Sequence, residues 1–93
     1  MKSKQAIEEV LLAHPGWKLS EEGIEKTFVF ESFGKAIQRM QELVPEINRV
    51  NHHPDWENSY NKVRVRLFTH DEGAVTQKDI NLLVLIEQHW GKS

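Results

Sequence analysis

Two adjacent histidines, His52 and His53, lie near the middle of the sequence and are followed directly by Pro54. Histidine is the side chain whose charge changes nearest neutral pH, so a site with several histidines can both donate and accept protons. A proline biases the preceding residue toward extended backbone, in which successive side chains point to opposite sides. We therefore expect the two imidazoles to point in different directions and to have different roles.

Two residues further along the chain are candidates for the same site. His70 is expected at the end of a strand and Asp79 at the start of a helix, where it is placed to orient one of the histidines, and loops between such ends commonly carry functional residues. Each also has a simpler interpretation, His70 as a surface residue of a strand and Asp79 as a carboxylate that caps its helix. His14 and His89 are interpreted as surface residues.

Aromatic and basic residues close to the histidines have structural interpretations as well. Trp56 and Tyr60 are expected in the core or on a sheet face. Arg64 and Arg66 are expected on a solvent-exposed strand face, with contact to an anionic ligand as the alternative. None of these four residues indicates chemistry by itself.

A metal site is a rival interpretation of the same histidines. His52, His53, His70 and Asp79 supply nitrogen and oxygen ligands of suitable kinds. However, neighbouring residues in extended chain rarely reach one ion, and the sequence has no His-x-x-x-His pair. The absence of cysteine removes thiolate ligands, thiol catalysis and disulfides. A metal-dependent hydrolase would carry stoichiometric metal after purification, which elemental analysis tests.

Length and charge restrict the class of protein. The 93 residues are expected to form one domain, residues 1–93, with a small core that a partner subunit would help to complete. A net charge of −2 provides no basic surface for nucleic acid. No apolar segment approaches membrane-spanning length, and the first residues lack the apolar stretch of a secretion signal. We expect a cytoplasmic protein that binds neither nucleic acid nor membranes.

Apolar spacing predicts the helices that must position the candidate site. Spacings of three and four predict a short helix over residues 4–13 and a longer one over residues 33–47, with Ser32 as its N-cap. Pro45 is expected to kink or end the longer helix in its last turn. Residues 48–51 would then be directed toward the histidines.

A third helix is predicted to begin at a capping box. Thr76 and Asp79 have the spacing of this motif, and the helix is expected to continue to about Trp90. Residues 82–86 are all apolar, which leaves little polar surface. This helix is therefore expected to be packed on two sides or against another subunit.

Four strands are expected in two pairs, the second of which alternates apolar and polar side chains. The predicted strands are residues 17–19 and 26–31, with a turn at 21–23, and residues 56–60 and 63–70, with a turn at 61–62. The order is α-β-β-α-β-β-α, which predicts an α+β domain with an antiparallel sheet.

Several short segments combine into a pattern of known spacing. They are Gly16-Trp17, Asn51-His52-His53-Pro54-Asp55-Trp56, Tyr60-Asn61-Lys62-Val63, Thr69-His70-Asp71 and Lys78-Asp79-Ile80-Asn81-Leu82. The pattern resembles the pterin-4a-carbinolamine dehydratase family. The resemblance spans about residues 16–88, and the combined spacing is far more specific than any single segment.

The resemblance implies a four-stranded antiparallel sheet with helices packed on one face, assembled as a homodimer or homotetramer. Members of the family dehydrate 4a-hydroxytetrahydropterin to quinonoid dihydropterin and so recycle the tetrahydrobiopterin cofactor of aromatic amino acid hydroxylases, without a metal or organic cofactor. In animals a member also stabilises dimers of a homeodomain transcription factor. A non-catalytic protein-binding or dimerisation module is therefore the alternative function.

The resemblance also implies roles for individual residues. His53 and His70 correspond to the acid/base histidines, and His52 corresponds to a histidine that contacts the pterin and assists, so that all three are candidate catalytic residues. The three histidines are also expected to contact the substrate, together with Asn51, Pro54, Thr69, Asp71 and Glu72. Asp79, Asn48 and Trp17 are expected to support the site.

One position departs from the family pattern. Four residues before His52 the family usually has an acidic residue, and this chain has Asn48. An amide forms hydrogen bonds but carries no charge and does not act as a base. Glu46 is nearby in the sequence, and the activity or the choice of pterin is expected to depend on this difference.

Overall fold

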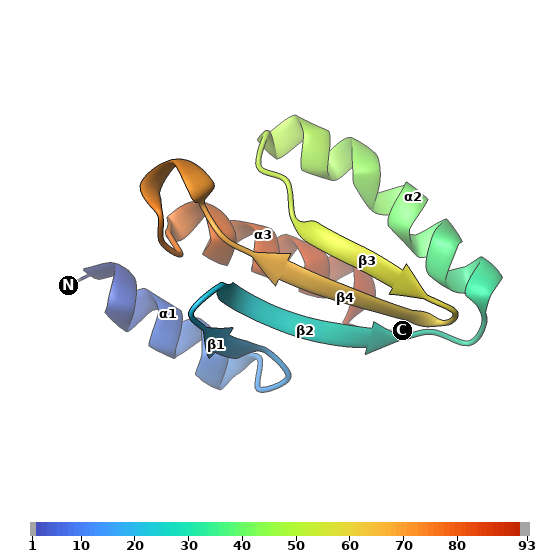
Figure 1. Cartoon of the computed structure of the whole chain (residues 1–93), viewed down its shortest axis with the longest axis horizontal. Coiled ribbons are helices and arrows are strands. Elements are labelled where there is room, and N and C mark those ends of the chain that lie inside the picture. Colours follow the sequence, from blue (N-terminus) through green and yellow to red (C-terminus); the bar gives the residue numbers. More distant parts are fainter. Residues whose placement is uncertain (1, 92–93) are drawn as a thin grey trace.

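A four-stranded antiparallel sheet forms one layer of the structure and helices form the other (Figure 1). The computed structural model describes residues 2–91, and side chains from Lys4 onward. The strands are β1 (Lys18–Ser20), β2 (Gly23–Val29), β3 (Asp55–Ser59) and β4 (Lys62–Leu67), in the order β1-β2-β4-β3. The helices are α1 (Lys2–Ala13), α2 (Phe33–Val50), α3 (Gln77–Trp90) and the short 3₁₀ helix η1 (His70–Glu72). The predicted fold class and element order are confirmed.

Helix α2 begins as predicted and ends later than Pro45. The Ser32 side chain accepts a hydrogen bond from the backbone N–H of Lys35, which caps the helix. Pro45 lies inside the helix at an exposed position, and the helix continues to Val50. The helix therefore does not end at Pro45, one of the two expected outcomes, and most of residues 48–51 form its last turn. Asn51 ends the helix in the left-handed conformation (φ 55°), which asparagine tolerates better than most residues.

Helix α3 has the predicted capping box and is largely buried. The Thr76 side chain accepts from the backbone of the first turn, while the Asp79 side chain accepts from the backbone N–H of Thr76. Figure 1 shows α3 behind the sheet, with α1 and α2 on its two sides. Within the apolar run Leu82, Leu83 and Ile86 are buried by this packing within the chain, and Val84 and Leu85 are half-buried.

Strand β4 lies inside the sheet and shows the predicted alternation. Val63, Val65 and Leu67 are fully buried on the helix side, whereas Arg64 and Arg66 face away from the helices. The strand ends at Leu67 rather than at residue 70, because the chain then forms an isolated bridge from Thr69 to Ala74 and the turn η1. His70 is consequently the first residue of η1 and not the last residue of a strand.

The other strands are also shifted from the sequence prediction, β1 and β3 by one residue and β2 by two or three. Strand β2 starts at Gly23, three residues early, because Ile24 and Glu25 pair with the end of β4. A Cβ atom on Gly23 would lie 2.3 Å from the carbonyl oxygen of Leu67, so this close approach needs glycine. The second turn falls at Tyr60 and Asn61, and Tyr60 is exposed there with a positive φ of 54°.

Aromatic rings fill the core at the end of α3. Trp90 packs edge to face against Phe28 and Phe30, and its ring lies parallel to that of Trp56, with the centroids 5.9 Å apart. Trp17 packs edge to face against Phe28. Together with the aliphatic residues of the sheet and helices, these rings form one continuous core. Within residues 2–91, no helix has the length and apolar character needed to cross a membrane.

Candidate active site

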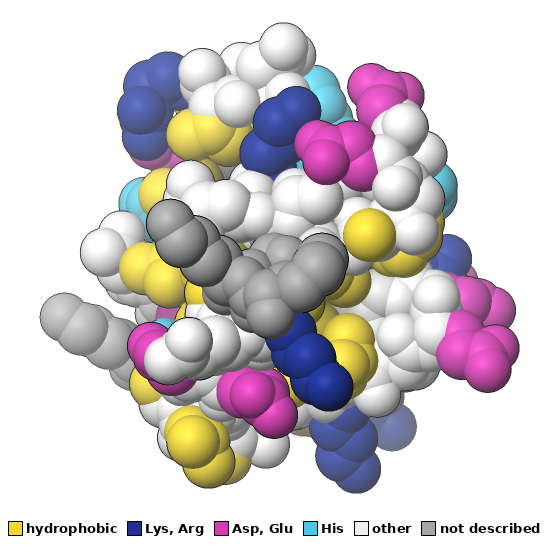
Figure 2. Space-filling view, turned by 90° about the vertical axis from the view of Figure 1, so that its left-hand side faces the viewer, with side chains coloured by type: hydrophobic (Ala, Val, Ile, Leu, Met, Phe, Trp, Pro, Cys, Tyr) yellow, Lys and Arg dark blue, Asp and Glu magenta, His cyan; other side chains and the backbone are white. Residues whose placement is uncertain are grey.

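The candidate histidines gather at one end of the sheet. His52 and His53 lie between the end of α2 and the start of β3, and His70 follows the end of β4. Strands β3 and β4 are antiparallel neighbours, and Asp55 pairs with Arg66, so the start of one strand adjoins the end of the other. Figure 2 faces this end of the molecule and shows histidine side chains at the surface among acidic and basic ones.

His52 is held by a buried carboxylate. Its Nε2 atom lies 2.6 Å from Oδ1 of Asp79, at the start of α3. The Asp79 side chain is 0% exposed and that of His52 is 15% exposed. A short hydrogen bond between an imidazole and a carboxylate that is shielded from water is a strong orienting contact. Asp79 therefore both caps its helix and positions a histidine.

Two threonines complete the surroundings of Asp79. The Thr69 hydroxyl donates to Oδ2 of Asp79 at 2.8 Å, and the backbone N–H of Thr76 donates to the same oxygen at 2.9 Å. The two threonine hydroxyl oxygens are 2.7 Å apart. Thr69 is itself 4% exposed. The carboxylate thus has two protein donors on Oδ2 and the imidazole of His52 on Oδ1, as a buried polar group requires.

His53 is oriented by the residue that departs from the family pattern. Its Nε2 atom lies 3.2 Å from Oδ1 of Asn48, in the last turn of α2. Because a carbonyl oxygen only accepts, Nε2 of His53 is the donor. Glu46 is instead bonded to Arg49 at 2.7 Å, and this hydrogen bond, together with the arginine's charge, lowers the pKa of the Glu46 carboxyl. Glu46 is thus occupied by Arg49, while His53 has a neutral partner in Asn48.

His70 has a different environment from the other two histidines. Its side chain is 71% exposed, and Nε2 lies 3.3 Å from Oδ2 of Asp55. The His70 ring also meets the ring of Phe68 edge to face, with the centroids 5.2 Å apart. These contacts leave most of the imidazole open to solvent. A hollow of about 300 Å³ adjoins His70, and its other lining residues are Glu21, Glu22, Arg66 and Phe68.

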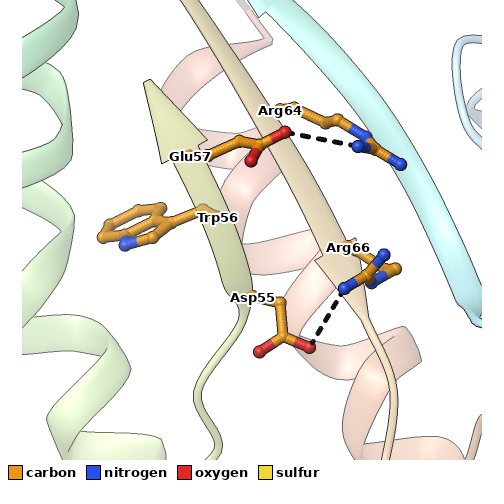
Figure 3. A pocket seen from close by; sticks show the side chains of 5 residues that line it. All are labelled: Asp55, Trp56, Glu57, Arg64 and Arg66. Carbon is orange, nitrogen blue, oxygen red and sulfur yellow. Dashed lines mark hydrogen bonds and ion pairs between the residues drawn. The ribbon is translucent and has the colours of Figure 1, made fainter. Parts of the chain in front are cut away.

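The two arginines of β4 are paired with carboxylates on the open face of the sheet. Arg64 bonds Glu25 at 2.8 Å and Glu57 at 3.2 Å, and these hydrogen bonds raise its pKa further. Arg66 bonds Glu22 at 2.8 Å and lies 3.9 Å from Asp55. Figure 3 shows the contacts of Arg64 with Glu57 and of Arg66 with Asp55, with Trp56 pointing away from both arginines. The interpretation as a solvated strand face is the one that fits Arg64.

Arg66 connects this ion-pair surface to the candidate site. It borders the hollow beside His70 and a second, smaller hollow of about 80 Å³ that Asp55 and Trp56 also line (Figure 3). Asp55 is shared between His70 and Arg66. The position of His70 is therefore coupled to the charges of the sheet face.

The remaining predicted site residues lie at different distances from the histidines. Asn51 adjoins His52 at the end of α2, and Pro54 leads into β3. Asp71 and Glu72 are exposed in η1, next to His70. Trp17 is 3% exposed in the core, where its indole N–H donates to Glu87 at 2.8 Å. Among the described contacts none joins Trp17 to the three candidate histidines.

Some functional partners were not visible in the sequence. Asp55 and Thr76 were noted as parts of a motif and of a helix cap, and the structure adds their links to His70 and to the Asp79 network. The capping box was a readable signal for Thr76. Nothing in the spacing showed that the second oxygen of Asp79 faces His52, because the two residues are brought together by the packing of separate elements. No group of three or more described histidine and acidic side chains is arranged to hold a metal ion.

The pterin 4 alpha carbinolamine dehydratase family model matches residues 2–89 of the chain, nearly its whole length. The chain belongs to this family. The match covers every element that forms the sheet and the histidine site, so the family resemblance extends well beyond the short motifs.

Proteins that carry the name of this family align along almost the whole of this chain. Proteins named "Putative pterin-4-alpha-carbinolamine dehydratase" from Prochlorococcus marinus and Sulfurisphaera tokodaii are 36% and 40% identical to it. The first alignment covers 91% of this chain and 90% of the relative, and the second covers 92% of each. A crystal structure described as a transcriptional coactivator/pterin dehydratase from Brucella melitensis is similar with a TM-score of 0.83 and 34% identity, covering 90% of this chain and 92% of that one. Fold and family therefore agree.

Proposed function

We propose that this protein dehydrates 4a-hydroxytetrahydropterin to quinonoid dihydropterin by histidine acid/base catalysis, as an enzyme of tetrahydrobiopterin recycling. The observation that carries the proposal is that each candidate histidine is held through one ring nitrogen. His52, His53 and His70 use Nε2 to bond oxygens of Asp79, Asn48 and Asp55, respectively. Each imidazole thus has an orienting partner and a second nitrogen for proton transfer.

The reaction requires one proton donor and one proton acceptor. The lone pair on N5 of the pterin expels the hydroxyl group from C4a, a protonated imidazole gives its proton to the leaving oxygen, and a neutral imidazole takes a proton from the ring. The products are water and the quinonoid dihydropterin. We assign the two proton transfers to His53 and His70, with His52 contacting the substrate and assisting. Each positioned proton transfer typically contributes about 10²–10⁴-fold to the rate.

The surroundings of His70 support a substrate position beside it. The adjoining hollow of about 300 Å³ is at the lower end of the size of small-molecule sites. Phe68 provides an aromatic wall for a flat pterin ring, and Arg66 a hydrogen-bond donor. In the proposed complex Asn51, Pro54, Asp71 and Glu72 make further substrate contacts from the adjoining segments, and the reaction needs no metal or cofactor.

The test is dehydration of 4a-hydroxytetrahydropterin generated in situ. The purified protein should accelerate the reaction over its spontaneous rate, and His53→Ala and His70→Ala should each lose about 10²-fold or more in kcat/KM. His89→Ala is the matched control, because His89 is exposed near the other end of α3. No acceleration by the wild-type protein would overturn the proposal, and so would full activity of both histidine variants.

A non-catalytic protein-binding or dimerisation module is the second candidate. Apolar side chains on α2 are exposed, among them Phe33, Val44 and Val50, and the similar crystal structure is described as a transcriptional coactivator as well as a dehydratase. As an enzyme, the protein is proposed to be a cytoplasmic homodimer or homotetramer. A double variant, His53→Ala with His70→Ala, separates the candidates: catalysis should collapse while the mass measured by light scattering stays that of the wild-type assembly.

A further inference from the structure

The buried network around Asp79 has a definite direction. The carboxylate has two oxygens with about four sites for donors, and three donors occupy them. Oδ2 accepts from the Thr69 hydroxyl and from the Thr76 backbone, and Oδ1 faces Nε2 of His52. The side chain is fully buried, so these protein donors replace water.

The two hydroxyl hydrogens can be assigned by counting. Thr69 has one hydroxyl hydrogen, and it points to Asp79. The contact between the two hydroxyl oxygens therefore requires Thr76 to donate to Thr69. The Thr76 oxygen also accepts from the backbone at the start of α3, at 3.3 Å from the N–H of Lys78. The order of donation runs from helix backbone to Thr76, to Thr69, and to Asp79.

The proton between His52 and Asp79 lies on the imidazole. Both lone-pair positions of Oδ2 are taken by donors, so this carboxylate acts as an acceptor, and its other oxygen, Oδ1, takes the same role toward Nε2 of His52. Nε2 of His52 is consequently an N–H donor to Oδ1. Among the described residues, Nδ1 of His52 has no hydrogen-bond partner, and the ring keeps some access to solvent.

We propose that Thr69, Thr76 and Asp79 are positioning residues that fix the tautomer of His52, so that Nδ1 is the atom it presents to the substrate. The substrate part of this inference rests on the proposed function. His52 then offers Nδ1 to the substrate as a hydrogen-bond acceptor, while Nε2 keeps its proton on the side of Asp79. Thr69 acts through Asp79, because its hydroxyl is used there and its backbone N–H bonds the carbonyl of Ala74.

The tautomer can be measured directly in the resting protein. Nitrogen-15 NMR of labelled histidine, at a pH where the ring is neutral, should show His52 with Nε2 protonated and Nδ1 bare. Asp79→Asn should reverse this assignment. The amide oxygen of the substituted side chain has to replace Oδ2, where two donors point, which leaves its NH₂ group facing Nε2 and forces the proton onto Nδ1. This reversal is a result that a purely structural role of Asp79 does not produce.

The threonine part of the network is tested by variants that preserve shape. Thr69→Val removes the hydroxyl with little change of volume. It should raise the rate at which the His52 Nε2 proton exchanges with water by about 10-fold and lower kcat by about 10-fold, because one hydrogen bond to a charged group is worth about that factor. Thr69→Ser keeps the hydroxyl and should stay within about 2-fold of wild type. Thr27→Val is the control, because Thr27 is exposed on β2.

The NMR outcome is independent of catalysis. A wild-type His52 with Nδ1 protonated, or with both tautomers equally populated, would overturn the inference even if the protein is an active dehydratase. If the His52 Nε2 proton exchanges equally fast in the Thr69→Val and Thr69→Ser variants, Thr69 does not help to position His52. The expected tautomer in a protein without dehydratase activity would leave the positioning inference intact and overturn the proposed function instead.

Discussion

Replacing Glu87 by glutamine should lower stability without harming the site. Oε2 of Glu87 accepts from both Trp17 and Lys26 at 2.8 Å, so one carboxylate joins the segment before β1, strand β2 and helix α3. The glutamine side chain has the same shape, and its amide oxygen is able to accept both bonds. The substitution therefore removes the charge and keeps the geometry.

The size of the effect follows from the burial of the pair. The side chains of Glu87 and Lys26 are 13% and 25% exposed, which places them between a solvent-exposed ion pair and a buried one. We expect a loss of about 1 kcal/mol, between the small value of exposed pairs and the larger value of charged hydrogen bonds. For a domain of this size that loss lowers Tm by about 4–8 °C.

The pH dependence of stability tests whether the charge of Glu87 causes this loss. Burial alone would raise the pKa of Glu87, but the hydrogen bonds from Lys26 and Trp17 and the charge of Lys26 outweigh it and lower this pKa. A carboxyl whose pKa is lowered by folding stabilises the protein above its unfolded value, and this contribution is lost as the pH falls through the folded value. The difference in the free energy of unfolding between wild type and Glu87→Gln should thus be constant around neutral pH and shrink below about pH 4.

Urea unfolding followed by tryptophan fluorescence, at a series of pH values, measures this difference. Glu9→Gln, on the exposed face of α1, is the control and should match wild type. Lys26→Met should largely remove the effect of Glu87→Gln in a double-mutant cycle. A difference of the same size at neutral pH and at pH 3, or no coupling to Lys26, would refute the ion-pair explanation. Dehydratase activity should be unchanged, because Glu87 lies about 12 Å along α3 from Asp79.

Two further predictions concern the site and the core. Asn48→Asp places a negative charge against Nε2 of His53 with little change of shape. The limb of the pH–rate profile that belongs to His53 should therefore move up by about one pH unit. An unchanged profile would exclude His53 as a titrating catalytic group. Trp90→Ala removes a ring that contacts Phe28, Phe30 and Trp56, and should cost about 3–5 kcal/mol in urea unfolding; a loss below about 1 kcal/mol would contradict the packing described.

The fold was predictable where the pattern of side chains is local. The Ser32 cap, the capping box of Thr76 and Asp79 and the alternation in β4 depend on neighbours within a few residues, and all three are confirmed. The strand boundaries were less predictable, because pairing across the sheet decides them. Gly23 begins β2 through its close approach to β4, which no local propensity indicates.

The candidate site was predictable as a set of histidines but not as a set of bonds. His52 and His53 stand out in the sequence, and the extended backbone that Pro54 favours is consistent with their bonding different partners. Their partners are set by tertiary packing: Asp79 reaches His52 from a different helix, and Asp55 reaches His70 from the neighbouring strand. The sequence also showed that Asn48 departs from the family pattern, but not that its amide oxygen accepts a hydrogen bond from His53.

Asp79 couples the fraying of the start of α3 to the release of the His52 ring. Oδ2 holds the first turn of α3 and Oδ1 holds His52, so a helix start that frays also releases the imidazole. Helix ends open at a smaller free energy than a whole domain does. Warming should therefore release the His52 ring before the sheet melts.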